Sequence, residues 1–141
     1  MRKTQLFIVI LSVAEMVSAG CGSSLPEALV SINVAPPNAS ATVTSANNSV
    51  QFTATGSFAP LIPSGGAGTA GVKIVGSVDQ TQKLTNAMWT SSAPVNVPIN
   101  SNGLAVCAGI TATPATITAS APGYKNGGYT TVSGTPTLSC N

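Results

Sequence analysis

The chain has 141 residues, of which 43% are hydrophobic, 4% aromatic and 6% charged. This length allows one domain with a buried core once a leader is removed, and the abundant Val, Ile and Thr favour β-strands. After Cys21 the charges are three lysines and two carboxylates, a net charge of +1 without a basic cluster. Such a chain has no electrostatic footprint for nucleic acid, so we expect no nucleic-acid partner.

The first twenty residues have the three-part organisation of a secretory signal peptide. Arg2 and Lys3 form a positive start, Leu6–Ala14 is an apolar run of nine residues, and small residues follow up to Gly20. A membrane-spanning helix needs about 20 apolar residues, so this run is too short to span. A buried N-terminal helix is the alternative. We expect residues 1–20 to be a signal helix that is cleaved on export.

The leader ends at a cysteine. The run Ser18-Ala19-Gly20-Cys21 resembles the lipobox of bacterial lipoproteins, in which a lipid is attached to the Cys before cleavage in front of it. This resemblance implies that Cys21 is a lipid attachment site and that residues 21–28 form a flexible tether to a membrane. Ser18 and Glu15 depart from the usual lipobox pattern. Ordinary cleavage after Ala19, which would release a secreted protein, is therefore the alternative.

Alternation of apolar and polar residues predicts short strands in the mature chain. The first predicted strand covers residues 30–34 and resumes over 41–44 as a short edge strand. Further strands cover 50–55, 87–91, 95–99, 104–106 and 115–121, and a last strand, interrupted near Gly134, covers 129–132 and 137–140. Pro98 makes the piece over 95–99 an edge strand. Asn102-Gly103 predicts a hairpin turn, Pro122-Gly123 a second turn, and Gly56 the end of the strand over 50–55. Residues 57–86 are predicted to be a long inserted loop, within which residues 72–78 form a strand or a small hairpin.

About seven strands without helical periodicity predict an all-β fold, namely a β-sandwich. Several pieces, taken in order, resemble the bacterial Ig-like domain, group 2. The matching runs are 31–34 (SINV), 50–56 (VQFTATG), 89–92 (WTSS), 101–104 (SNGL), 108–109 (AG) and 115–119 (ATITA). The resemblance covers about residues 29–139, and it implies that residues 29–141 form one Ig-like domain. It implies an exported, cell-surface or envelope protein with no enzymatic activity. The insert over 57–86 departs from the family pattern.

The chain has three cysteines, an odd number that points to a separate use for one of them in an exported protein. If Cys21 carries a lipid, Cys107 and Cys140 remain as an even pair for an oxidising compartment. A disulfide between them would close a loop of about 33 residues and stabilise the fold by about 3 kcal/mol. Two unpaired, buried thiols are the alternative. We predict the disulfide.

Few groups in the mature chain transfer protons. The chain has no His, and after Cys21 its carboxylate side chains are Glu27 in the tether and Asp79 in the insert. The Ser and Thr hydroxyls have no evident base, and metal sites need more ligands than these. We therefore expect no enzyme, no cofactor and no metal. A cleft that joined Asp79 to a Lys and a Ser would revive an enzymatic interpretation.

Trp89, Phe52 and Ile117 are assigned to the core between the sheets. For Trp89 the alternative role is a platform on which a sugar ring stacks. Tyr124 and Tyr129 flank a Gly-rich run, which we interpret as a hairpin tip with one partly buried Tyr. A contact loop is the alternative there.

These features predict a non-catalytic, exported module for interaction or adhesion, anchored by an N-terminal lipid in the outer membrane, at the cell surface or in the periplasm. Its partner would be a protein or a glycan. The alternative is a structural stub or spacer without a ligand. The segment 57–86 discriminates between them, because an ordered segment with exposed Leu61 and Ile62 would favour binding.

Overall fold

The structure is a computed structural model that describes residues 26–44, 46–63, 72–74 and 80–141. Every regular element within these ranges is a β-strand. The described residues form no helix that is long and apolar enough to cross a membrane. The expected signal peptide over 1–20 and the expected lipid attachment residue Cys21 lie outside the described ranges.

Eleven strands are found in the described residues, and they confirm the all-β sandwich. In chain order they are β1 (Glu27–Ala35), β2 (Asn38–Ala41), β3 (Ser49–Gln51), β4 (Thr53–Pro63), β5 (Val72–Ile74), β6 (Gln80–Lys83), β7 (Met88–Ser91), β8 (Leu104–Val106), β9 (Ala115–Lys125), β10 (Gly128–Gly134) and β11 (Thr137–Cys140). The number exceeds the expected seven because some extended runs are interrupted. Only Phe52 separates β3 from β4, and Thr135 and Pro136 separate β10 from β11.

The first layer is built on β4. β1 runs antiparallel to it, with Ile32 opposite Gly56, and β6 pairs antiparallel with the middle of β4. β5 pairs with the last residues of β4. β3, which leads directly into β4, forms a separate antiparallel ladder with β8.

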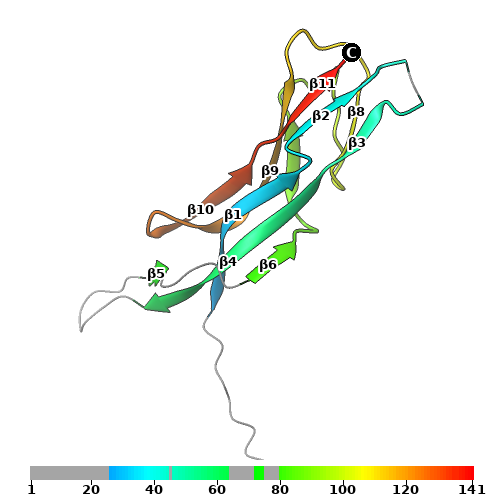
Figure 1. The fold of residues 1–141 in the computed structure, drawn as a ribbon. Helices are drawn as coiled ribbons and strands as arrows, with labels where there is room; N and C mark the ends of the chain where they lie inside the picture. The colour runs from blue at the N-terminus through cyan, green and yellow to red at the C-terminus, as the bar shows by residue number, and fades with distance from the viewer. Residues whose placement is uncertain (1–25, 45, 64–71, 75–79) are drawn as a thin grey trace, which may run out of the picture.

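The second layer is built on β9. β7 pairs with one edge of β9 and β10 with the other, since Ala119 is opposite both Trp89 and Gly134. β11 pairs with the first residues of β9 and lies parallel to β2. Figure 1 shows β2 and β11 side by side near the C-terminus, whereas the β9–β10 hairpin extends toward the other end of the molecule.

β1 packs closely on β9 and β10. The main-chain oxygen of Leu29 faces Gly123, and that of Ile32 faces Gly134. A Cβ atom at Gly134 would lie 2.5 Å from the Ile32 oxygen and 3.0 Å from Cγ2 of Val34. A Cβ atom this close to its neighbours would clash in a close-packed interior. The two layers can therefore lie this near each other because Gly123 and Gly134 have no side chains.

The core lies between the layers and contains Phe52 and Ile117, whose side chains are 1% and 0% exposed. Trp89 is half-buried and packs at the margin of this cluster instead of being enclosed by it. Much of the remaining core is made of small side chains. The buried alanines are Ala28, Ala41, Ala54, Ala59, Ala87, Ala105, Ala115 and Ala119.

Cys107 and Cys140 form the predicted disulfide. Their Cα atoms are 5.5 Å apart, the two residues are separated by 33 positions, and both side chains are 0% exposed. Cys107 follows β8 and Cys140 ends β11, so the bond joins the β3–β8 ladder to the second layer.

The strand predicted over 50–55 does not end at Gly56. β4 continues through this residue, and β6 pairs with β4, so parts of the expected inserted loop over 57–86 are paired strands. Gly56 stays in the ladder because Leu29, Leu84 and Phe58 fill the space that a side chain there would occupy. The glycine is a packing feature and not a turn.

The predicted turn at Pro122-Gly123 is wrong, because β9 continues to Lys125 and the turn lies at Asn126-Gly127. Both turn residues have positive φ angles, 53° and 82°, as the two-residue hairpin turn of type I′ requires. Lys125 and Gly128 close the hairpin. In an antiparallel ladder, hydrogen-bonded and non-hydrogen-bonded pairs alternate. Counted from the closing pair, Pro122 falls in a non-hydrogen-bonded pair with β10, so its missing N–H costs the ladder no bond.

The edge strand predicted over 95–99 is also wrong. The carbonyl oxygen of Ala93 accepts a hydrogen bond from the Val97 N–H at 2.7 Å, which turns the chain. Ile99 alone pairs with β8, as an isolated bridge to Ala105. Pro98 has no N–H to extend that pairing into a ladder.

The last two residues of the expected tether over 21–28 belong to the folded domain, whereas residues 21–25 lie outside the described ranges. β1 already begins at Glu27. The next residue, Ala28, is buried in a small cluster with Leu61 and Tyr124. The domain therefore includes the last residues that were expected to be tether.

We expect Gly134→Ala to destabilise the fold by about 2 kcal/mol, because the new methyl group meets the Ile32 main chain and the layers must separate. Gly128→Ala is the matched control, since nothing lies within 4 Å of a Cβ atom there. Urea unfolding of both variants measures the difference. Equal midpoints would show that close packing at Gly134 does not control stability.

We expect the double substitution Cys107→Ala with Cys140→Ala to lower the free energy of unfolding by about 3 kcal/mol or more, since the cross-link constrains the unfolded chain. Dithiothreitol should lower the urea midpoint of the unsubstituted protein toward that of the variant, and leave the variant unchanged. A midpoint that does not respond to reductant in either protein would argue against the disulfide.

Candidate functional site

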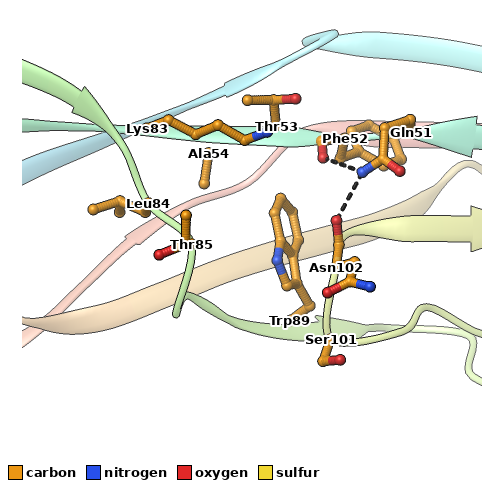
Figure 2. A pocket seen from close by; sticks show the side chains of 10 residues that line it. All are labelled: Gln51, Phe52, Thr53, Ala54, Lys83, Leu84, Thr85, Trp89, Ser101 and Asn102. Atoms are coloured by element: carbon orange, nitrogen blue, oxygen red, sulfur yellow. Dashed lines mark hydrogen bonds between the residues drawn. The ribbon is translucent and has the colours of Figure 1, made fainter.

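A cleft of about 420 Å³ opens beside Trp89, between β4 and the turn that precedes β8. Figure 2 shows the indole in its middle, with Leu84 and Thr85 on one side and Ser101 and Asn102 on the other. The lining residues are Gln51, Phe52, Thr53, Ala54, Lys83, Leu84, Thr85, Trp89, Ser101 and Asn102.

The cleft has an apolar floor and a polar rim. Phe52 and Ala54 are each 1% exposed, and the half-buried Leu84 lies beside them. The exposed side chains at the rim carry hydroxyl, amide and ammonium groups. Lys83 is the one charged residue among those that line the cleft. Ligand sites commonly combine an apolar surface with a few oriented polar groups in this way.

Trp89 is positioned by the strand that carries it. β7 pairs with β9 with Trp89 opposite Ala119, and alternation along the strand turns its neighbours Met88 and Thr90 to solvent. Gly103 lies against the indole, because a Cβ atom there would be 2.9 Å from Cζ2 of Trp89. A larger residue at 103 would displace the ring, so this glycine determines how the indole sits in the cleft.

The turn before β8 holds the other side of the cleft. The side-chain Oδ1 of Asn100 accepts hydrogen bonds from the N–H groups of Asn102 at 2.9 Å and Leu104 at 3.0 Å. Gly103 has φ of +80°, a conformation that side chains disfavour. Its carbonyl oxygen accepts a hydrogen bond from the Phe52 N–H at 2.8 Å, which fixes the turn to the floor. The turn predicted at Asn102-Gly103 is thus present, but in the described residues the bridge between Ile99 and Ala105 is its only pairing with β8, so no two-stranded hairpin forms.

Gln51 fastens this turn to the first layer. Its Nε2 donates hydrogen bonds to the carbonyl oxygens of Phe52 at 2.8 Å and Asn102 at 2.7 Å (Figure 2). The bond to Asn102 joins distant parts of the sequence, since the two residues are 51 positions apart, whereas Phe52 is the next residue along the chain. Gln51 is therefore a positioning residue for the rim.

Several polar groups in the cleft remain available, and three of them lie on Trp89 and on the turn beside it. Within the part of the chain that the structure describes, the hydroxyl of Ser101, the side-chain amide of Asn102 and the indole N–H of Trp89 make no hydrogen bond. A hydroxyl and an amide can each donate and accept, whereas the indole only donates. The cleft thus offers oriented hydrogen-bonding groups next to an aromatic ring.

A second aromatic feature lies at the β9–β10 hairpin. The rings of Tyr124 and Tyr129 meet edge to face, with centroids 5.3 Å apart. Tyr124 is 2% exposed and Tyr129 is 78% exposed. The hairpin tip expected here therefore holds one buried Tyr and presents the other to solvent.

The described residues contain no group of three or more His, Cys, Asp or Glu side chains that could hold a metal ion. Asp79, on which an enzymatic interpretation depended, lies outside them. The absence of a metal, a cofactor and an enzymatic activity therefore stays a prediction.

Comparison with known proteins finds no protein-family model that matches this chain and no curated protein that is significantly similar to it. Membership of the bacterial Ig-like group 2 family therefore stays a prediction.

The residues singled out from the sequence do not form one site. Cys107 and Cys140 are joined, and Phe52 and Ile117 are buried in the same core. Of these residues, Phe52 forms part of the floor of the cleft, and Trp89 borders the cleft with its half-buried ring. Sequence reasoning missed the partners that surround it, namely Gln51, Lys83, Thr85, Ser101 and Asn102. The Asn-Gly hairpin was the only available signal, and it did not show which surface the hairpin would face.

We expect Gln51→Ala to loosen the turn before β8 and to cost about 1 kcal/mol of stability, because the hydrogen bond that joins Gln51 to the distant Asn102 main chain is lost. Amide hydrogen exchange should accelerate at Phe52 and Gly103. Ser49→Ala, an exposed change in the same strand, is the control. Unchanged exchange at Gly103 in the Gln51 variant would mean that Gln51 does not hold the turn.

Proposed function

We propose that this protein is an exported, non-catalytic domain of the cell envelope, of the bacterial Ig-like group 2 type, that binds a partner through the cleft beside Trp89. The observation that carries the binding role is this cleft, in which a half-buried aromatic ring stands next to unpaired polar groups. An Ig-like sandwich presents loops and strand ends for such contacts.

Export is supported by the disulfide. Bonds of this kind persist in oxidising compartments and are rare where cytosolic thiols are kept reduced. Cys107 and Cys140 are fully buried in the core, so their bond belongs to the folded domain itself. The positive start and apolar run of residues 1–20 agree with the same destination.

Anchoring at Cys21 would hold the domain close to a membrane. Only residues 22–25 separate Cys21 from Pro26, the first described residue. An extended chain spans at most about 3.5 Å per residue, so the domain would begin within about 18 Å of the acylated cysteine. We propose that the anchored protein exposes its cleft at the envelope surface or in the periplasm.

A structural spacer without a ligand is the second candidate function. Leu61, which was expected to be exposed if the insert took part in binding, is buried beside Ala28 and Tyr124. Because a buried Leu61 is not available to a partner, this observation favours the spacer over binding through the insert. The Trp89 cleft, which lies on other segments, favours the binding role.

We expect the full chain, expressed in a bacterium, to appear in the membrane fraction with the mass of residues 21–141 plus acyl groups. Cys21→Ser should abolish the acyl mass and release the protein from the membrane, whereas Ser24→Ala should leave both unchanged. Intact-mass spectrometry of each fraction measures this. Cleavage after Ala19 without added mass would contradict the anchor and favour a secreted form.

A further inference from the structure

We propose that the cleft beside Trp89 binds a sugar ring of a glycan, which stacks on the indole and bonds to Asn102 and Ser101. This inference names the partner of the cleft described above, and it therefore rests on the binding role proposed for the protein. A pyranose ring has one apolar C–H face and a rim of hydroxyl groups. The cleft has the complementary arrangement, an aromatic and apolar interior with a polar rim.

The stacking surface is rigid. β7 holds the main chain of Trp89 against β9, and Gly103 lies within contact of the indole ring. The buried side chains of Phe52 and Ala54 close the floor beside it. A Trp side chain has few rotatable bonds, and this one is already fixed by packing, so a ligand would order little on binding.

The hydrogen-bonding groups suit hydroxyl ligands. The Ser101 hydroxyl and the Asn102 amide both donate and accept, as sugar hydroxyls do. Neither makes a hydrogen bond within the described residues, and the indole N–H of Trp89 is equally unpaired. The hydroxyl groups of a sugar whose apolar face lies on the indole would give the Ser101 and Asn102 side chains hydrogen-bonding partners.

The rim is pre-organised for this contact. Asn100 accepts hydrogen bonds from the main chain of Asn102 and Leu104, and Gln51 donates to the Asn102 carbonyl oxygen. These bonds use the main chain of Asn102 and leave its side chain free. Because these three bonds are made without a ligand, little reorganisation is needed when a ligand binds.

The hydroxyl groups at the rim and the shape of the cleft favour a sugar over an acyl chain or a peptide strand as the ligand. The rim residues Thr53, Thr85 and Ser101 carry hydroxyl groups, which an acyl chain would leave without partners. The segments that carry Thr85 and Asn102 flank the indole on opposite sides (Figure 2), and an extended peptide needs an open groove or strand edge.

The single Trp of the chain makes the test direct, since its fluorescence reports on Trp89 alone. The full chain, solubilised in a detergent without a sugar headgroup, is titrated with chitotriose, cellotriose and maltotriose up to about 10 mM, a range that detects weak binding. We expect a saturable change in Trp emission with at least one trisaccharide. No change with any of the three would overturn the proposal.

Variants then locate the site. Asn102→Ala should weaken binding of the active trisaccharide about tenfold, and Ser101→Ala should weaken it less, since each loses bonds to sugar hydroxyls. Thr130→Ala, an exposed change on β10 away from the cleft, is the control and should bind like the unsubstituted protein. Unfolding midpoints check that each variant folds. Equal affinity in all three variants would place the sugar elsewhere and overturn the site.

Trp89→Phe keeps an aromatic ring and removes the indole N–H, so calorimetry should detect weakened binding that persists. Trp89→Ala removes the aromatic face altogether, and unaltered calorimetric affinity in that variant would contradict stacking. The mass measurement at Cys21 tests the anchored envelope domain independently of any sugar. Failure of the titration and failure of the proposed function are therefore distinguishable.

Discussion

The Cys107–Cys140 disulfide is the covalent bond that joins the β3–β8 ladder to the second layer. The core around it consists largely of small side chains, and an alanine buries much less apolar area than a Leu or Phe. The disulfide closes a loop of 33 residues and so lowers the conformational entropy of the unfolded chain. This adds to the modest stability that a core of small side chains provides. This contribution exists only where thiols are oxidised, which links the fold to the exported location that we propose.

The small side chains also explain how closely the layers approach. Gly123 and Gly134 admit the main chain of β1, and Gly56 leaves space for Leu29 and Leu84. Because the first layer sits so near β9, the few large side chains fill the remaining space or lie at its margin. Phe52 takes the centre of the core. Trp89 is left at the margin, where one side of the cleft opens.

Trp89 therefore has two roles. Its ring covers the end of the core, as the core assignment requires, and it also borders the cleft, as a stacking platform would. The sequence presented these roles as alternatives, but a half-buried ring serves both. The turn at Gly103 is the feature that makes this possible, since a glycine there lets the main chain approach the indole without covering it.

The alternation of apolar and polar residues determined the all-β class and the strands around Ile32, Trp89 and Ile117, because a strand with one buried face must alternate. The cysteine count determined the disulfide. Tertiary structure decided where strands end. Gly56 and Pro122 are turn formers in isolation, yet both lie within strands, since packing fills the space beside Gly56 and the ladder needs no N–H from Pro122. Tertiary structure also decided the cleft, because one hydrogen bond joins Gln51 to Asn102, 51 positions away, beside Trp89, and no local sequence pattern records such a contact.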